Sequence, residues 1–309
     1  MKIYTLKKDN KEFVAIETKF GKLLPLENLN IYYKTMLELI EHNQNPKFNI
    51  LKSLSNSDDL SKSVIPFSKT PVDLRPFLLD FSDIELCAPI PVPAQDLICL
   101  GLNYSDHANE SAKFKKSSFS NSQNYPVYFS KRVSRASGSG ETIPSYTGIV
   151  DSLDYEAELA LIIGKECKNV AKHSAYEYVF GYTIINDVTA RNIQMRHNQW
   201  YFGKSFDGFL PMGPCIVTAD EFLSPPVLKI QSRVNGEVRQ HSSTDKLIYD
   251  IPHIITELSQ GFTLKPGTII ALGTPAGVGM GFDPPKWLKS GDKVECEIEK
   301  IGILSNVVK

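Results

Sequence analysis

The chain has 309 residues, of which 42% are hydrophobic and 22% charged, and its formal net charge at pH 7 is −1. This composition is typical of a globular protein with a sizeable core, and the near-zero charge provides no field that would favour nucleic acid or an anionic membrane as a partner. No apolar run approaches the roughly 20 residues of a membrane span, and the first residues are too soon charged for a signal peptide. We therefore expect a cytoplasmic protein.

The five cysteines are scattered along the chain and include no Cys-x-x-Cys pair. Four of them lie within or beside apolar strands, which is typical of buried free thiols in a reducing compartment. Their spacing does not support a zinc site, and a cysteine nucleophile stays open as an alternative.

Residues 1–85 are predicted to form a small α+β domain. Residues 12–17 alternate like a strand, and residues 32–41 carry apolar side chains at helical spacing. This part shows no motif for chemistry, so it either packs on the main domain or supports an oligomer contact. Residues 86–95, with three alternating prolines, form a linker to a larger domain at 96–309.

The larger domain is predicted to begin with a buried strand at 96–101, followed by a turn and a helix that carries His107 and Glu110. Residues three apart on a helix lie on one face and can touch. A carboxylate beside an imidazole orients the ring and raises its basicity, as a water-activating general base requires. The alternative is an exposed ion pair. The serine-rich residues 111–124 are expected to form a mobile segment that can close over this site.

A strand is predicted at 154–164, and it carries two acids on one face. Side chains two residues apart in a strand point to the same side about 7 Å apart, so Glu156 and Glu158 repel each other if the sheet is covered. A proton on one acid, approaching basic side chains or a hard cation between the acids would offset that repulsion. The alternative is an edge strand with both acids in water.

A second apolar strand, at 182–188, carries Asp187 close to its end. If the two strands are neighbours, this third carboxylate completes a set of three oxygen ligands. Water or substrate would then fill the remaining positions of an octahedral Mg²⁺ or Mn²⁺ site.

The C-terminal part of the chain adds a lysine and a glycine-rich loop. Lys204 follows an aromatic cluster and can place an ammonium in a partly buried site as an oxyanion partner, the alternative being an exposed loop lysine. Residues 268–279 read as a buried strand and a loop, whose free N–H groups and Thr274 hydroxyl can receive a carboxylate. The remainder is predicted to be β-rich, with a hairpin turn at Asn235 and Gly236.

Several separated segments, taken together and in order, resemble the fumarylacetoacetate hydrolase family. The matching segments are GLNYSDH at 101–107, DYEAELA at 154–160, GYTIINDVTAR at 181–191, GKSFD at 203–207, PMGP at 211–214, VNGE at 234–237 and GTPAGVG at 273–279. They span the chain from about residue 96 to its C-terminus. By its position, the N-terminal unit is similar to the small leading domain of longer, bacterial-type members.

The resemblance implies a fold, a metal and a set of site residues. The fold is a β-rich α+β roll of mixed sheets with few helices and the small N-terminal α+β domain, commonly assembled as a homodimer. The implied residues are Glu156, Glu158 and Asp187 as ligands of Mg²⁺ or Mn²⁺, His107 and Glu110 as a water-activating dyad with Lys204 nearby, and Arg191, Gln194 and Thr274 near the substrate. Asn192 departs from the aspartate often seen after the arginine.

The resemblance also implies chemistry on a small 2-oxo acid that chelates the metal, with cleavage of a carbon–carbon bond through a stabilised enolate. In acylpyruvate-type hydrolysis, His107 with Glu110 would activate water and Lys204 would stabilise the oxyanion. In oxaloacetate-type decarboxylation, CO₂ leaves without an attacking water. The alternatives are an isomerase, dehydratase or lyase acting on a dienoic or sugar-derived 2-oxo acid, and a partner-binding scaffold of the same fold.

Overall fold

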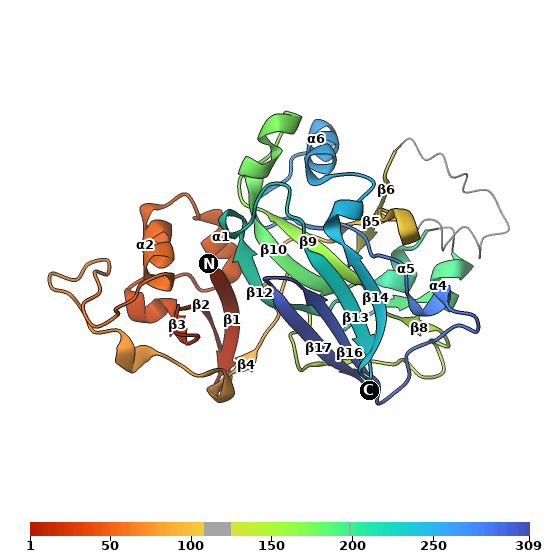
Figure 1. Ribbon diagram of the computed structural model, residues 1–309, viewed down its shortest axis with the longest axis horizontal. Helices are drawn as coiled ribbons and strands as arrows, with labels where there is room; N and C mark the ends of the chain where they lie inside the picture. The colour runs from red at the N-terminus through yellow and green to blue at the C-terminus, as the bar shows by residue number, and fades with distance from the viewer. Residues whose placement is uncertain (108–124, 198) are drawn as a thin grey trace.

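The computed structural model describes residues 1–107, 125–197 and 199–309. The predicted mobile segment 111–124 and Glu110 lie outside the described residues. Two sheets dominate the molecule, and short helices lie around them (Figure 1). This arrangement confirms the predicted β-rich α+β class.

The described strands form a ten-stranded, a five-stranded and a two-stranded sheet. The large sheet has the order β3 (Leu23–Pro25), β2 (Lys11–Glu17), β1 (Lys2–Lys8), β12 (Met212–Thr218), β10 (Val179–Asn186), β9 (Ala157–Ile163), β15 (Ile269–Ala271), β5 (Leu97–Gly101) and β6 (Val127–Lys131), with β4 (Glu85–Leu86) beside β1. The smaller sheets are β14 (Glu237–Ser243), β13 (Lys229–Val234), β16 (Lys293–Ile298), β17 (Gly302–Val308) and β7 (Thr142–Ile143), and β11 (Thr189–Ala190) with β8 (Leu153–Asp154).

The helices are short and lie at the ends and on the faces of the sheets. In the part of the chain that the structure describes, the α-helices with defined bounds are α1 (Met36–Glu41), α2 (Pro46–Ser55), α4 (Arg191–Arg196), α5 (Tyr201–Lys204) and α6 (Ile251–Gly261), and residues 105–107 are also helical. The 3-10 helices are η1 (Leu26–Leu29), η2 (Arg75–Phe77), η3 (Phe81–Asp83), η4 (Lys172–Tyr178), η5 (Ala219–Glu221), η6 (Thr244–Lys246) and η7 (Gly279–Gly281). A search of the described residues finds no helix with the length and apolar character needed to cross a membrane.

The five-stranded sheet packs on one face of the large sheet, over the central strands β9, β10 and β12 (Figure 1). The core between the sheets contains Leu159 and Leu161 of β9 together with Ile230 of β13. Ala160 and Ile162, which alternate with them, belong to a second core on the opposite face, shared with α1 and α2. The predicted period-two alternation of this strand is therefore confirmed, and both of its faces are covered.

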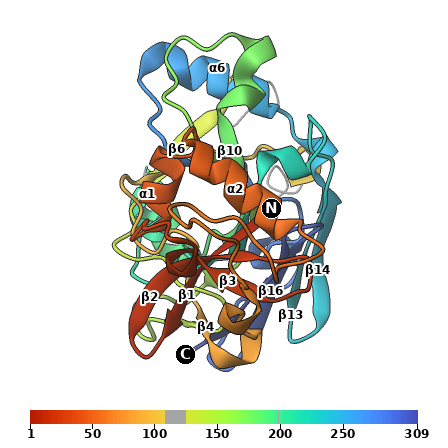
Figure 2. The ribbon, with the colours of Figure 1, turned by 90° about the vertical axis from the view of Figure 1, so that its left-hand side faces the viewer.

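The N-terminal unit extends the large sheet instead of forming a sheet of its own. Strand β1 pairs antiparallel with β12, with Ile3 opposite Ile216, and β2 and β3 follow outward. Phe48 of α2 packs against Phe180 of β10, with ring centroids 5.6 Å apart. Figure 2 shows this side, with α1 and α2 above strands β1 to β3. The hydrogen-bonded ladder thus crosses from residues 1–85 into the larger domain.

In the N-terminal unit the observed elements differ from those predicted from the sequence. Strand β1 and helix α2 were not predicted. Helix α1 begins at Met36, later than the expected residue 32, because the Thr35 hydroxyl accepts the N–H of Glu38 (3.2 Å) and caps the helix there. In the C-terminal part the predicted hairpin is confirmed, since Asn235 and Gly236 both have positive φ between β13 and β14.

Ile3→Ala is expected to lower the free energy of unfolding of the whole chain by about 2–5 kcal/mol, because Ile3 is fully buried in a strand that continues the large sheet. Both tryptophans, Trp200 and Trp287, lie in the larger domain. Chemical unfolding followed by their fluorescence should therefore shift together with circular dichroism. Lys8→Ala, at the exposed end of β1, is the control and should change stability by less than about 0.5 kcal/mol. A separate early transition without a fluorescence shift would contradict the expectation.

Candidate active site

Two buried glutamates stand at the start of strand β9. Glu156 directly precedes the strand and Glu158 lies within it, and the two residues are 5% and 1% exposed. The strand is paired with β10 on one side and β15 on the other, so the alternative of an edge strand in water is wrong. The two acids are held side by side on a covered face, where their charges need compensation.

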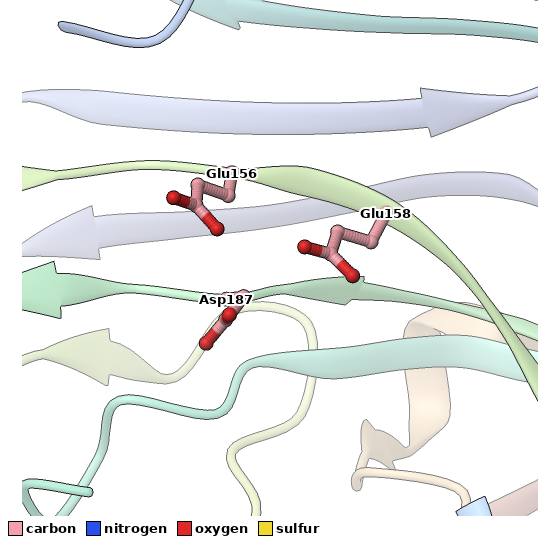
Figure 3. Close-up of side chains that lie close together, drawn as sticks. All are labelled: Glu156, Glu158 and Asp187. Atoms are coloured by element: carbon pink, nitrogen blue, oxygen red, sulfur yellow. The ribbon is translucent and has the colours of Figure 1, made fainter. Parts of the chain in front are cut away.

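Asp187 brings a third carboxylate to the same place. It directly follows β10, and its N–H donates to the Glu156 carbonyl (2.8 Å), while the Glu156 N–H donates to Asn186 Oδ1 (2.9 Å). Ligand atoms of Glu156, Glu158 and Asp187 all lie within 4.8 Å of one another. Figure 3 shows the three carboxylates turned toward one another from the two neighbouring strands. The structure thus brings the three expected ligands together, and their role in metal binding stays a prediction.

Two buried ammonium groups compensate these acids. Lys204 Nζ lies 2.7 Å from Glu156 Oε2 and 2.6 Å from Asp187 Oδ2, so the alternative of an exposed loop lysine is wrong. Lys131, at the end of β6, lies 2.7 Å from Asp187 Oδ1. Burial lowers the pKa of Lys131, whereas for Lys204 the attraction of Asp187 and Glu156 outweighs burial and raises the pKa. Lys131 was missed in the sequence, where a lysine at a strand end beside an arginine gives no signal of burial.

Arg191 supplies a third cation, and Asp154 holds it. The guanidinium lies 2.9 Å through Nε from Asp154 Oδ2 and 2.6 Å through Nη2 from Glu156 Oε1. Asp154 also accepts the N–H groups of Gly279 (2.6 Å) and Met280 (3.1 Å). Asp154, which the sequence placed in a motif without a role, therefore ties the arginine and the glycine-rich loop to the acids.

The pKa values of the two glutamates are shifted in opposite directions. Burial opposes the charge of Glu156, but Lys204 and Arg191 outweigh it and lower its pKa to about 2. Burial raises the pKa of Glu158 well above the usual carboxyl range, and the charges of Asp187 and Glu156 raise it further. Without an ion, the raised pKa favours a proton on Glu158. A divalent cation bound at this carboxylate would supply the positive charge in place of that proton. Carboxylate oxygens have two lone pairs, so those that already accept from Lys204 or Arg191 can also bind a cation, and this all-oxygen set fits Mg²⁺ or Mn²⁺.

A cavity of about 50 Å³ opens beside the acids. Its polar lining includes Glu156, Glu158, Lys204 and the predicted residues His107, Arg191, Gln194 and Thr274. Its apolar lining includes Leu100 and Leu102 together with four residues here called the outer wall, which are Phe129, Met195, Trp200 and Met280. The structure thus gathers all the predicted site residues that it describes, and the pairing of His107 with Glu110 stays a prediction because Glu110 is outside the described residues.

The glycine-rich loop does receive carboxylates, but they belong to the protein. The Gly273 N–H donates to Glu158 Oε2 (2.8 Å), as those of Gly279 and Met280 do to Asp154. The Thr274 hydroxyl donates to the Ala157 carbonyl (2.9 Å). The loop was expected to receive a carboxylate, and those it receives are the acids Glu158 and Asp154, while contact of Thr274 with substrate stays a prediction.

The chain was compared with known families and proteins. The family model described as fumarylacetoacetate (FAA) hydrolase C-terminal matches residues 96–309, which include all the site residues above. Over 312 aligned residues the chain is 40% identical to the oxaloacetate tautomerase YisK of Bacillus subtilis (strain 168), with 100% of both proteins covered.

Solved structures show the same similarity. A fumarylacetoacetate hydrolase from psychrophilic Exiguobacterium antarcticum has a TM-score of 0.80 at 36% identity, with 100% of this chain and 99% of that chain covered. A maleylpyruvate hydrolase from Sphingobium sp. SYK-6, in complex with manganese(II) and pyruvate, has a TM-score of 0.74 at 26% identity, with 100% and 98% covered. Both matches include the N-terminal unit.

Binding of Mg²⁺ or Mn²⁺ is expected to release a proton and to weaken as the pH falls through the raised pKa of Glu158, because the ion and the proton compete for the same carboxylate. Calorimetric titrations in buffers of different ionisation enthalpy count the protons released. Glu158→Gln, which cannot ionise, should abolish this proton release. An affinity that does not vary with pH in the wild type would contradict the expectation.

Lys131→Met is expected to lower the free energy of unfolding in EDTA by about 3–5 kcal/mol, because it leaves the buried Asp187 short of one cation. Mg²⁺ or Mn²⁺ should recover part of this loss by supplying charge at the same carboxylate. Thermal unfolding with and without the ion measures both effects. Arg132→Met removes an exposed neighbouring cation and should show neither. An equal loss of unfolding free energy in EDTA and with the ion would show that Lys131 has no influence on the ion site.

Proposed function

The chain belongs to the fumarylacetoacetate hydrolase family, and we propose that it is a divalent-metal-dependent enzyme that acts on a small 2-oxo acid. The observation that carries this proposal is the convergence of Glu156, Glu158 and Asp187 beside a cavity with an imidazole and two further cations. A scaffold that kept the acids would still need cations to compensate them, but it would have no use for a histidine that lines a cavity beside them.

The reaction that we favour is the interconversion of the keto and enol forms of oxaloacetate or a related acid. It is supported by the 40% identity, over the whole chain, to a protein named an oxaloacetate tautomerase. The sequence led us to expect cleavage of a carbon–carbon bond. Both reactions pass through negative charge shared between C3 and the 2-oxo oxygen. They differ in the bond that breaks, which is C–H in tautomerisation and C–C in the cleavage reactions.

The residues around the cavity have distinct tasks in this reaction. When bound, a divalent cation supplies Lewis-acid stabilisation of negative charge on nearby substrate oxygens. His107 lines the cavity and can take the C3 proton of the keto form and return it to the 2-oxo oxygen, so that one C–H bond breaks and one O–H bond forms.

Arg191 and Lys204 provide the positive charge that receives a dicarboxylic substrate. Two of the five N–H groups of Arg191 donate to Asp154 and Gln194. Its Nη2 forms an ion pair with Glu156 without a hydrogen-bond partner in the described residues, so an N–H group there can donate to a substrate carboxylate. Two N–H groups of Lys204 point to the acids, and its third can donate to the developing oxyanion. The outer wall gives the cavity an apolar side next to these charged groups.

Carbon–carbon cleavage is the second candidate. It is supported by the similarity to a maleylpyruvate hydrolase solved with manganese(II) and pyruvate. In this reaction His107, with Glu110 as its partner, would activate water for attack on a carbonyl carbon. For either reaction we propose Mg²⁺ or Mn²⁺ as the cofactor and a homodimer as the working assembly.

Three assays on two compounds, oxaloacetate and acetylpyruvate, distinguish these reactions. The enol absorbance of oxaloacetate reports tautomerisation, pyruvate release reports decarboxylation, and loss of acetylpyruvate absorbance reports hydrolysis. We expect tautomerisation to be the fastest, to require Mg²⁺ or Mn²⁺ and to stop in EDTA. His107→Asn should lower kcat by about 10²–10⁴-fold, because it removes the proton carrier and leaves the acids intact.

Matched glutamate variants test the site itself. Glu156→Gln should abolish turnover and weaken ion binding, whereas Glu177→Gln, on an exposed surface of η4, should change neither. Faster pyruvate release than tautomerisation would favour the second candidate. Ion binding without turnover of either compound would contradict both candidate reactions and support the scaffold.

A further inference from the structure

Strand β15 ends before it reaches the metal-ligand end of β9. The two strands pair from Ile269 opposite Ile162 to Ala271 opposite Ala160, and the Leu272 N–H donates to the Leu159 carbonyl (3.0 Å). The chain then turns away at Gly273, which has a φ of +91°. The backbone of Ala157, two residues further along β9, thus faces a position that β15 does not fill.

Two side chains complete the ladder at this position. The Ala157 N–H donates to Gln240 Oε1 (3.1 Å), Gln240 Nε2 donates to Thr274 Oγ1 (2.6 Å), and Thr274 Oγ1 donates to the Ala157 carbonyl (2.9 Å). Gln240 Nε2 also donates to the Pro275 carbonyl (2.8 Å). We call this closed ring the Gln240–Thr274 clamp. Gln240 is 0% and Thr274 3% exposed, so water does not compete for these bonds.

The clamped residue stands between the two glutamates. Fixing both the N–H and the carbonyl of Ala157 fixes the peptide planes through which Glu156 and Glu158 are attached. Gln240 comes from β14, at the edge of the five-stranded sheet, so the clamp links that sheet to the metal-ligand end of β9. We propose that Gln240 and Thr274 are positioning residues that hold Glu156 and Glu158 in the geometry required by a divalent cation, an inference that rests on the cation site of the proposed function.

The clamp assigns Thr274 a role other than contact with substrate. Its hydroxyl has one hydrogen, which is donated to Ala157, and one of its lone pairs accepts from Gln240. Replacement of Thr274 should therefore change ion binding even when no substrate is present. Replacement of Gln240, which does not line the cavity, should have the same effect.

The test uses Gln240→Leu, Thr274→Val and the double variant, each measured in two ways. Hydrogen exchange of a peptide spanning Ala157 is followed by mass spectrometry in the metal-free protein, and the Kd for Mn²⁺ is measured by calorimetry. We expect faster exchange in both single variants and a Kd raised by about 10–100-fold. Because the ring is one unit, the double variant should be little worse than either single one.

Two control variants separate the clamp from general damage. Thr274→Ser keeps the hydroxyl and should bind Mn²⁺ nearly as the wild type does. Ser232→Ala removes a buried hydroxyl opposite Gln240 on β13, one with no hydrogen-bond partner among the described residues, and should change neither readout. Circular dichroism and the exchange of β16 establish that each variant is folded. If Gln240→Leu does not fold, the comparison of Thr274→Val with Thr274→Ser decides the test.

The outcomes separate this inference from the proposed function. Wild-type exchange at Ala157 in folded Gln240→Leu and Thr274→Val would overturn the clamp whether or not the protein binds an ion. A raised KM with an unchanged Kd in Thr274→Val alone would overturn it in favour of direct substrate contact. If the wild type does not bind Mn²⁺, the proposed function and the positioning role are both overturned. The exchange measurement at Ala157 then still shows whether the Gln240–Thr274 clamp exists. Weaker Mn²⁺ binding in both variants, with no turnover by the wild type, would support the clamp and contradict the proposed enzyme.

Discussion

Three carboxylates buried side by side repel one another, and much of the structure around them compensates that repulsion. Lys204 lies between Glu156 and Asp187, while Lys131 and Arg191 approach from either side. This compensation is uneven, since the pKa of Glu156 is lowered to about 2 and that of Glu158 is raised. The unevenness leaves room for one more source of positive charge, and for this reason the cluster fits an ion site better than a structural salt-bridge network.

The part of the site that follows from local spacing was predictable. Alternation along a strand places Glu156 and Glu158 on one face, and the end of the next strand supplies Asp187. The supporting residues were not predictable, because they come from distant segments and resemble solvated residues in the sequence. Lys131 ends a strand of ordinary composition, and Gln240 stands in a hairpin at the edge of another sheet. Their roles depend on tertiary contacts alone.

The fold shows the same division. The central strand with its two faces, the hairpin at Asn235 and the β-rich class follow from periodicity and turn chemistry, and the structure agrees with them. Strand β1 was missed because its few apolar residues stand among lysines and because one of the strands it pairs with, β12, comes more than two hundred residues later. For the same reason the sequence suggested a separate N-terminal unit, whereas the hydrogen-bonded ladder is continuous.

The outer wall of the cavity is built from elements other than those that carry the acids. Met195 belongs to α4, Trp200 precedes α5 and Met280 lies in η7, whereas the three carboxylates come from β9 and β10 and the short segments next to them. A side chain of the wall can therefore be replaced without replacing an acid, although α4 and α5 also carry Arg191 and Lys204, which bind the acids. Relatives named for a tautomerase and for hydrolases share this fold. Such a separation lets evolution alter which molecules are accepted while the inherited charge chemistry persists.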